Sequence, residues 1–384
     1  MQYYLIQPRD PLIIRSGRPF EEISDAQAAR FPPPSTVAGA LRNMYARSNG
    51  LPLDEALLKL AVRGPLAVKL GPKGKDCILV PKPADAQYFA DPTTGNPQLI
   101  RMVPMKPASG EGCDLPKEAL YPLFPEQSFK GKPVPGPNWW ALDDLITWRK
   151  GTESLDFKSV QENSWTPVGP DIRTHIAMDN QRRASVSGQI FQTTGLCMWQ
   201  KPTDKARFPD TSIGILGGIE GEITQPGLVH LGGERRLAQV KPCDLWPKMP
   251  KERLTSTAKV NGLIITFLTP TIFENGWLPG WLSDEQTLIG QLPGTDVTVQ
   301  LRAAALDRWI PQSGWDLKNR QPRAAQKMIP AGATYWFECI GQSVTADVMQ
   351  SLWMRNLCDD KQTNRNGFGL ALPAPWMIDD SHTI

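Results

Sequence analysis

The sequence predicts an α+β fold built from two ferredoxin-like (βαββαβ) units that carry long insertions. Near the amino end, an aromatic and β-branched stretch at 3–7 is typical of a strand, and an amphipathic helix is predicted at 36–47. Near the carboxyl end, strands are predicted at 260–268 and 335–339, followed by a helix. Each half of the chain therefore shows strands that flank one helix, which is compatible with one such unit per half.

The helix predicted at 36–47 follows three prolines that stop any earlier regular element. Ser35 is a good N-cap for it, because a serine oxygen can accept a hydrogen bond from the first turn. Apolar side chains recur at helical spacing, and the small residues at 38–40 should let the helix approach a sheet closely. In the second half, Thr345 is the predicted cap of a helix whose apolar face extends to Leu357, and a strand-like stretch follows at 370–372.

We predict a first domain at 1–225 and a second at 226–384, which contains a glycine-rich loop at 364–369. Residues 71–137 are rich in Pro, Gly and Lys and have weak periodicity, so they are predicted to be a loop-rich insertion. Residues 172–196 alternate polar and apolar around Gly188, which indicates a β-hairpin.

Composition excludes several classes of protein. The chain has 384 residues, is 40% hydrophobic and carries a formal net charge of +3, which permits nucleic-acid binding without arguing for it. No apolar run is long enough to span a bilayer, and the first residues lack the features of a signal peptide, so a cytoplasmic protein without a membrane partner is expected. The six cysteines form no CxxC pair, which argues against a zinc site or a disulfide framework.

Catalytic motifs are equally scarce. The sequence has no GxSxG elbow, no phosphate-binding P-loop, no GxGxxG that opens a helix and no HExxH pair, so we predict no cofactor, no metal and no catalytic residues. The chain has three histidines, of which His382 lies in the tail. His175 and His230 are therefore the candidates for general acid–base chemistry.

Arginines and hydroxyl groups in predicted loops and helix starts are the candidate RNA ligands. Such groups bind phosphate oxygens, and the first turn of a helix adds free N–H groups. The loop at 232–236 combines two glycines, which allow close approach of a backbone to a ligand, with two arginines. The candidate RNA-binding set is Arg15, Arg18, Arg30, Ser35, Thr36, Arg42, Arg182, Arg183, Arg235, Arg236, Arg323, Arg365 and Asn366. Phe20, Phe31 and Phe368 lie nearby in sequence as possible stacking partners for bases.

Eight segments follow one another in a recognisable order along the whole chain. They are PLIIRSGRPF (11–20), FPPPSTVAGALR (31–42), LGGERR (231–236), LTP (268–270), GWLPG (276–280), GWDL (314–317), IPAGATYWFE (329–338) and NGFG (366–369). Together they resemble the RAMP superfamily of CRISPR proteins, whose members have ferredoxin-like (RRM-like) domains. Within it, the chain resembles the family of the third subunit of the type III-B Cmr effector complex. The terminal loop holds two glycines where many members have a longer run.

The resemblance implies a non-catalytic RNA-binding role in antiviral defence. It implies that the chain grips the repeat-derived 5′ tag of the CRISPR guide RNA (crRNA). It also implies contacts with the large Palm-domain (cyclase) subunit and with the first copy of the repeated RAMP backbone subunit, and with target RNA through the complex. Under this interpretation Arg15, Arg18 and Arg42 converge with Arg235 and Arg236, or with Arg365.

Two alternatives remain open at this point. The first is a metal-independent RAMP endoribonuclease that matures the precursor of the guide, in which His230 beside Arg235, or His175 beside Arg182, supplies a base and a cation. The second is the equivalent subunit of another type III subtype, such as type III-D, with the same function class and different partners.

Overall fold

The computed structural model describes residues 1–14, 29–71, 75–108, 110, 112–151, 155–201, 211–254, 260–284, 286–316, 321–322 and 324–378. It is a mixed α and β protein. The strand pairs of its two main sheets are antiparallel, in agreement with the predicted α+β class. Contacts divide it into two compact units that interleave along the chain. Unit 1 comprises 1–76, 167–245 and 311–327, and unit 2 comprises 77–166, 246–310 and 328–384. The boundary predicted at 225–226 lies inside unit 1.

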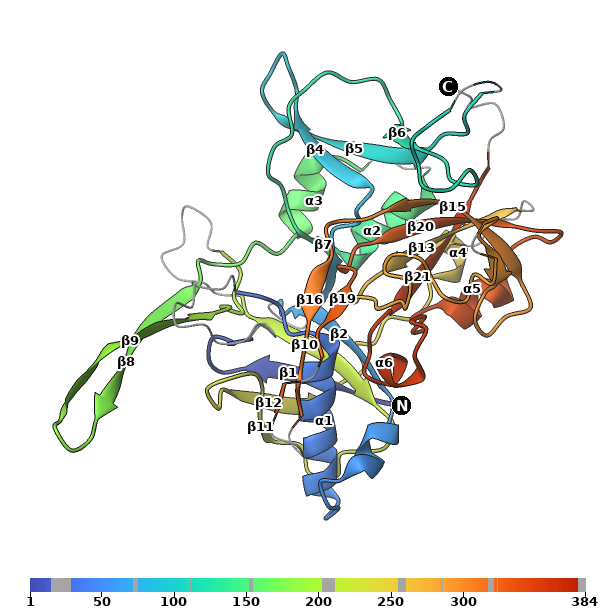
Figure 1. Ribbon diagram of the computed structural model, residues 1–384. Helices are drawn as coiled ribbons and strands as arrows, with labels where there is room; N and C mark the ends of the chain where they lie inside the picture. The colour runs from blue at the N-terminus through green and yellow to red at the C-terminus, as the bar shows by residue number, and fades with distance from the viewer. Residues whose placement is uncertain are drawn as a thin grey trace. The chain divides into compact units, whose positions relative to one another are not determined.

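The sheet of unit 1 has the strand order β11-β12-β1-β10-β2 (Figure 1). If β1, β2, β10 and β12 are counted as first to fourth, the order of these four is 4-1-3-2. The predicted strand at 3–7 is β1, and the buried side chains of Tyr4 and Ile6 face the core. The strands are β1 (Gln2–Pro8), β2 (Val62–Lys69), β10 (Ile213–Ile219), β11 (Leu228–His230) and β12 (Leu237–Pro242).

Helix α1 (Pro34–Ser48) packs on β2 and β10 and is followed by the short 3₁₀ helix η1 (Glu55–Lys59). The helix is confirmed, but its predicted cap is wrong. Pro33 occupies the N-cap position and no side chain caps the helix, so Ser35 lies inside the first turn. Of the small residues at 38–40, Ala38 and Ala40 are buried, whereas Gly39 is exposed with no atom within 4 Å of an added Cβ. Gly217 of β10 also lies close to the helix, since a Cβ there would lie 3.1 Å from Leu41.

Unit 1 also contains a long β-hairpin of β8 (Asp171–Asp179) and β9 (Ala184–Gly195), which projects from its sheet (Figure 1). The predicted hairpin is confirmed, but its turn is at 180–183 and not at Gly188. The side chain of Asp179 accepts hydrogen bonds from the backbone N–H groups of Gln181 and Arg182, which fixes the turn there. Gly188 lies inside β9 with a positive φ, next to an irregularity in the strand register.

The main sheet of unit 2 has the order β14-β15-β20-β13-β21. If β13, β15, β20 and β21 are counted as first to fourth, these four strands follow the same 4-1-3-2 order when the sheet is read from β21. The strands predicted at 260–268 and 335–339 are β13 and β20. Thr345 caps α5 as predicted, by accepting a hydrogen bond from Val348, but the helix ends at Leu352. The elements are β13 (Gly262–Phe267), β14 (Ile289–Gln291), β15 (Thr298–Ala305), β20 (Thr334–Cys339), α5 (Ala346–Leu352), α6 (Lys361–Arg365) and β21 (Ala371–Trp376).

Residues 77–166 of unit 2 contain more regular structure than the sequence predicted. Four strands fall within 71–137, joined by long loops, and weak periodicity hid them because these strands are short. The helix predicted at 142–148 is confirmed as α2. The elements are β3 (Cys77–Pro81), β4 (Ala86–Ala90), β5 (Pro97–Pro104), β6 (Leu123–Pro125), β7 (Trp139–Ala141), α2 (Leu142–Lys150) and α3 (Phe157–Asn163).

The remaining elements are short. Two small antiparallel pairs lie between β15 and β20, and one single-turn helix precedes β13. They are α4 (Lys251–Leu254), β16 (Ile310–Gln312), β17 (Trp315–Asp316), β18 (Gln321–Pro322) and β19 (Gln326–Met328). Within the part of the chain that the structure describes, no helix combines the length and the apolar character needed to cross a bilayer.

A buried ion pair joins the 77–166 segment to the sheet of unit 2. Asp85 receives two hydrogen bonds from the guanidinium of Arg149, at 2.6 and 2.7 Å, and their side chains are 1% and 2% exposed. Arg149 also donates to Thr266 of β13 and Thr334 of β20, both at 2.8 Å, and Trp148 donates to Asp85. Burial alone would raise the pKa of Asp85, but the charge and hydrogen bonds of Arg149 outweigh it and hold the pKa below its usual value.

This depressed pKa predicts an acid-dependent loss of stability. An unfolded aspartate has a pKa of about 3.9, so the contribution of Asp85 is fully present above that pH and is lost as the pH falls toward the lower folded pKa. We expect urea unfolding of the wild type to show this loss below about pH 4. The Asp85→Asn variant, which cannot titrate, should be less stable at pH 6 and should lose less stability on acidification. Parallel pH profiles for both proteins would contradict the assignment.

Candidate nucleic-acid interface

The glycine-containing loop of unit 1 is the turn at 231–236 between β11 and β12. The backbone N–H of Gly233 donates to the carbonyl of Ile13 at 2.7 Å. Gly232 has a φ of +80°, and a Cβ there would lie 2.6 Å from the Ile13 oxygen. The close backbone approach expected at this loop therefore exists, but the neighbour is the chain segment at 11–14 and not a phosphate.

The two arginines of this turn differ in exposure. Arg235 is exposed and adopts a left-handed backbone conformation, with a φ of +53°. Arg236 is partly buried, and its Nε atom is enclosed without a hydrogen-bond partner among the described residues. Of the pair, Arg235 is the side chain that the turn presents to solvent.

The segment at 11–14 also contacts the base of the hairpin. Leu12 exchanges two backbone hydrogen bonds with Leu196, at 2.9 and 2.8 Å. The segment thus joins the 231–236 turn to the end of β9. Arg15, Arg18 and Phe20 come directly after it in sequence, and they lie outside the described residues, as does Arg323.

The hairpin has two chemically different faces. On one face, the ring of His175 stacks on Phe191 with centroids 5.0 Å apart, and Arg173 lies on the same face. His175 Nε2 is 2.9 Å from the hydroxyl of Thr193, which holds the ring in place. The other face, which we call the aliphatic face, carries Ile172, Ile176 and Ile190, which are 54%, 52% and 65% exposed. Thr174 and Gln192, joined by a hydrogen bond, lie between these isoleucines.

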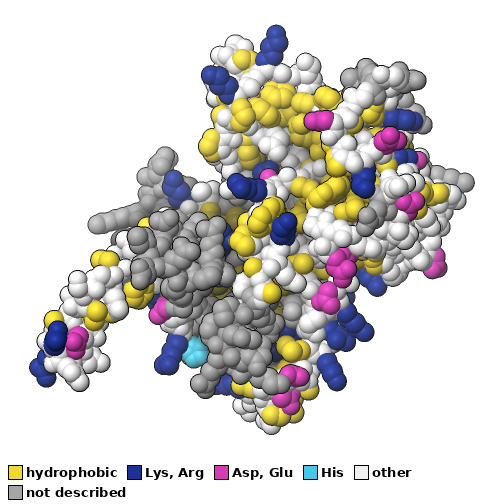
Figure 2. All heavy atoms as spheres, in the orientation of Figure 1, with side chains coloured by type: hydrophobic (Ala, Val, Ile, Leu, Met, Phe, Trp, Pro, Cys, Tyr) yellow, Lys and Arg dark blue, Asp and Glu magenta, His cyan; other side chains and the backbone are white. Residues whose placement is uncertain are grey.

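The turn of the hairpin carries Arg182 and Arg183, both exposed. Figure 2 shows Lys and Arg side chains at the end of the hairpin. The Arg182 side chain is 86% exposed and its nearest carboxylate, that of Asp179, is 3.8 Å away. An ion pair this exposed contributes little to the stability of the fold, so a structural role does not explain the two arginines of the turn. The hairpin thus offers exposed cations at its end and a stacked aromatic pair along one face, the two kinds of group that bind single-stranded RNA.

The start of α1 holds three more predicted residues. Arg30 is exposed, and Ser35 and Thr36 are half-buried. The N–H of Thr36 already donates to the carbonyl of Pro33 at 3.0 Å, and the hydroxyl of Ser35 lies 3.5 Å from the side-chain amide of Gln312. Phe31 is half-buried.

Arg42 has a structural role within unit 1. It is 6% exposed, and its guanidinium donates to the carbonyl of Leu60, at 2.8 and 3.2 Å, and to that of Leu58. It ties α1 to the end of η1, so the geometry does not bring it to the turn at 231–236. The predicted convergence of Arg42 with Arg235 is wrong, because the arginine faces into the unit.

Replacing Arg42 with alanine should therefore lower stability without weakening RNA binding. The variant loses charge-assisted hydrogen bonds to the carbonyls of Leu58 and Leu60, in a partly buried position, which we expect to cost about 2 kcal/mol. Chemical denaturation and an RNA titration of the same preparation measure both effects. Arg47→Ala, an exposed arginine of the same helix, is the control and should change neither. A loss of RNA affinity in the Arg42 variant with unchanged stability would contradict this assignment.

In unit 2, the predicted residues Arg365 and Asn366 lie at the end of α6 and are half-buried. The loop that follows packs inward. Phe368 is 3% exposed beside Met328 and Cys358, and the carbonyl of Gly367 accepts a hydrogen bond from Thr269. Phe368 is a core residue, so its suggested role as a stacking platform is wrong.

Neither histidine pair proposed for cleavage is assembled. His230 Nδ1 contacts the backbone carbonyl of Arg235, and not its guanidinium. His175 pairs across the hairpin with Phe191, whereas Arg182 lies in the turn. Among the described residues, no three His, Cys, Asp or Glu side chains gather as metal ligands.

Arg173 and Phe191 were not among the residues predicted from the sequence, but the structure places them beside His175 on one face of the hairpin. Their signal was present in the alternation of 172–196, which places Arg173, His175 and Phe191 on one face once the strands are paired. Assigning these residues to one face requires the register of β8 and β9, and that register depends on the position of the turn at 180–183.

The model of a family described as CRISPR-associated protein (Cas_Cmr3) matches residues 4–376. No curated protein matches the chain. Two similar solved chains come from structures of the type III-B Cmr-beta bound to cognate target RNA, one of them with AMPPnP. They are 15% and 16% identical, with a TM-score of 0.47 for each, and 87% of this chain and 86% of each of theirs are covered.

A third solved chain belongs to the Csm3–Csm4 subcomplex of the type III-A interference complex. It is 10% identical, with a TM-score of 0.30, and 91% of this chain and 96% of that chain are covered.

Proposed function

Because the chain belongs to the CRISPR-associated Cmr3 family, and so to the subunits of type III-B effector complexes, we propose that it holds the 5′ tag of the guide RNA. In this proposal the protein is a non-catalytic RNA-binding subunit. It bridges the large Palm-domain subunit and the first copy of the backbone subunit, and meets target RNA through the complex.

The fold supports the finer architecture that the sequence predicted. We propose that each unit is a ferredoxin-like RAMP unit, since both sheets contain the 4-1-3-2 order of a βαββαβ motif. Each has one of the two helices, α1 in unit 1 and α5 in unit 2. Irregular chain or a short strand takes the place of the other helix.

One observation of unit 1 carries the RNA proposal. The segment at 11–14, which leads into Arg15 and Arg18, is fixed between the 231–236 turn and the base of the β8–β9 hairpin, whose other end carries Arg182 and Arg183. We propose that Arg15, Arg18, Arg235, Arg182 and Arg183 contact the phosphates of the tag. Arg173 and the stacked pair of His175 and Phe191 supply a platform for a base.

The aliphatic face of the hairpin supports a protein partner. Three isoleucines more than half exposed on one face of a two-stranded ribbon leave apolar surface in water that association would bury. We propose that a neighbouring subunit covers this face while RNA occupies the other.

The test compares binding of the full chain to a guide RNA that bears its 5′ tag and to one that lacks it, in EDTA. We expect tag-dependent binding with intact RNA. In the triple variant Arg182→Ala, Arg183→Ala, Arg235→Ala the affinity should fall, and the slope of log affinity against log salt should fall by about 2. The control removes three exposed cations elsewhere in unit 1, Arg47, Lys59 and Lys241, so the net charge changes equally.

Each outcome of this comparison has a definite meaning. Equal losses in the two triple variants would show that charge alone matters and would refute the assigned contacts. RNA cleavage in EDTA that disappears in His230→Ala would replace the proposal with the endoribonuclease. Binding without any tag preference would contradict tag recognition by this chain.

A further inference from the structure

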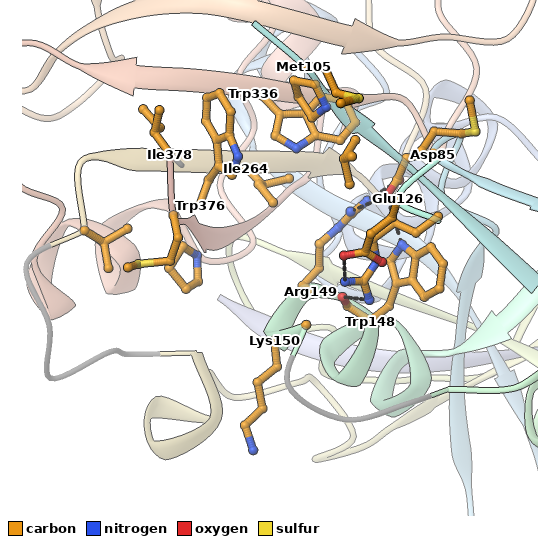
Figure 3. Close-up of a pocket in the computed structure, with 18 of the residues that line it drawn as sticks. Asp85, Met105, Glu126, Trp148, Arg149, Lys150, Ile264, Trp336, Trp376 and Ile378 are labelled. Atoms are coloured by element: carbon orange, nitrogen blue, oxygen red, sulfur yellow. Dashed lines mark hydrogen bonds and ion pairs between the residues drawn. The ribbon is translucent and has the colours of Figure 1, made fainter. Parts of the chain in front are cut away.

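A cavity of about 710 Å³ lies within unit 2, on one face of its five-stranded sheet. Figure 3 shows Ile264 of β13 and Trp376 of β21 on one side of it, Trp148 and Glu126 on the other, and Trp336 of β20 beside Met105. Its volume falls within the range of small-ligand sites. None of the residues that line it takes part in the RNA interface of unit 1.

Strand register explains why half of this sheet face is open. Ile264 pairs with Trp336, and Gly262 pairs with Trp376, so alternate residues of the three strands share one face. Thr266 lies further along the same face, where Arg149 covers it. The buried ion pair thus closes one end of the face and leaves the other end hollow.

Trp376 forms a flat wall of the cavity because its strand partner is a glycine. A Cβ on Gly262 would lie 2.9 Å from Cε3 of Trp376, so the indole ring occupies the space above the glycine. Trp336 and Ile264 are 2% and 8% exposed and form the floor. An indole wall beside an apolar floor accepts a flat ring, since every base has an aromatic face that stacks on such a platform.

The cavity carries an excess of positive charge. The guanidinium of Arg101 lies 4.2 Å over the ring of Trp148 and donates to the Trp148 carbonyl at 2.7 Å. If Asp85 and Arg149 neutralise each other, the charged lining consists of four cations and two carboxylates. These are Arg101, Lys106, Lys150 and Arg253, against Glu126 and Glu252. Arg101 lies 3.7 Å from Glu126, and Arg253 is paired with Asp143 outside the lining, so the net excess is one positive charge. An anionic ligand is therefore favoured over a neutral one.

The edge of the sheet argues against a peptide strand as the occupant. β21 is the last strand of the sheet order, and it contains Pro373 and Pro375. Proline has no N–H to donate, so this edge is a poor template for a strand added by a partner. The ligand that combines a flat ring, polar edges and negative charge is a nucleotide.

We propose that this cavity binds one unpaired nucleotide of single-stranded RNA. Its base stacks on Trp376, and its phosphate lies near Arg101 and Lys150. The inference rests on the proposed function only for the identity of the ligand as RNA, because the site is separate from the tag interface of unit 1.

The experiment uses the full chain and a hexaribonucleotide that contains 5-iodouridine and no tag sequence. We expect ultraviolet crosslinks at the strands that carry Trp336 and Trp376, mapped by mass spectrometry. Trp376→Ala should weaken binding about tenfold, and Trp376→Phe should retain most of the affinity because the ring remains. Trp309→Ala, which removes a 51% exposed tryptophan of the same unit outside the cavity, is the control and should bind normally.

Thermal unfolding of each variant shows that it is folded, and the phenylalanine variant keeps the test valid if the alanine variant is not. Unchanged affinity in Trp376→Ala, or crosslinks confined to unit 1, would overturn the proposal. Normal RNA affinity of Trp376→Ala combined with failed assembly into the effector complex would also overturn the proposal, and would assign the cavity to a protein segment. If binding shows no tag preference but still depends on Trp376, tag recognition by this chain is refuted, whereas the nucleotide site in unit 2 is supported.

Discussion

Replacing Arg149 with alanine should lower the free energy of unfolding by about 3–5 kcal/mol. The side chain is 2% exposed and makes four hydrogen bonds, two to the Asp85 carboxylate and one each to Thr266 and Thr334. Its removal leaves Asp85 charged, buried and without its cation. A buried charge that has lost its partner is far more costly than the pair is stabilising. Urea unfolding at pH 7 measures the effect.

A surface pair in the same unit is the matched control. Arg253 donates to Asp143 at 2.8 Å, nearly the same distance, but the two side chains are 37% and 83% exposed. Arg253→Ala should change stability by about 1 kcal/mol or less, because solvent screens an exposed pair. If the two alanine variants were equally destabilised, burial would not be the cause. A double-mutant cycle with Asp85→Ala then isolates the coupling between Asp85 and Arg149.

The ion pair also determines the shape of the cavity in unit 2. Arg149 connects α2 to β13 and β20, and the neighbouring Trp148 holds Arg101 against its ring. Loss of this connection should release the wall that faces Trp376. We therefore expect Arg149→Ala to weaken binding of the tag-free hexanucleotide, in proportion to the fraction of protein in which the wall has moved.

The regular elements with strong periodicity could be predicted from the sequence, and those defined by long-range pairing could not. Helix α1 and strand β13 have enough apolar repeats to be identified alone. The short strands β4, β5 and β6 pair mainly with one another, and their residues are largely half-exposed, so no clear alternation marks them. The interleaving of the two units is likewise a property of contacts between distant segments.

The loops of the candidate site could be predicted from the sequence, but the contacts that their side chains make could not. The arginines of the hairpin and of the 231–236 turn are exposed, as loop arginines commonly are. Arg42 has the same sequence features as an RNA ligand on a helix, yet it faces the carbonyl of Leu60. Only the position of η1 distinguishes the two roles. The cavity of unit 2 gave no sequence signal, since its walls come from strands and loops that are distant in the chain.

Replacing Gly232 with valine should disrupt both the fold of unit 1 and RNA binding. The φ of +80° is strained for any branched residue, and its Cβ would lie 2.6 Å from the carbonyl of Ile13. Together, backbone strain and overpacking should lower stability by about 3 kcal/mol. Gly39→Ala is the opposite case, because that glycine is exposed in α1 with open space around it. It should raise stability by about 0.5–1 kcal/mol.

The consequence for RNA follows from what the Ile13 carbonyl holds in place. If the clash moves the segment at 11–14 away, the hydrogen bond from Gly233 is lost, and the segment that leads into Arg15 and Arg18 is no longer held at the 231–236 turn. Tag affinity of the folded Gly232→Val protein should then fall below that of Arg235→Ala, although the variant removes no charge. RNA titrations at a temperature where both variants are folded measure this difference. Equal affinities for Gly232→Val and wild type would show that the segment at 11–14 is no part of the RNA interface.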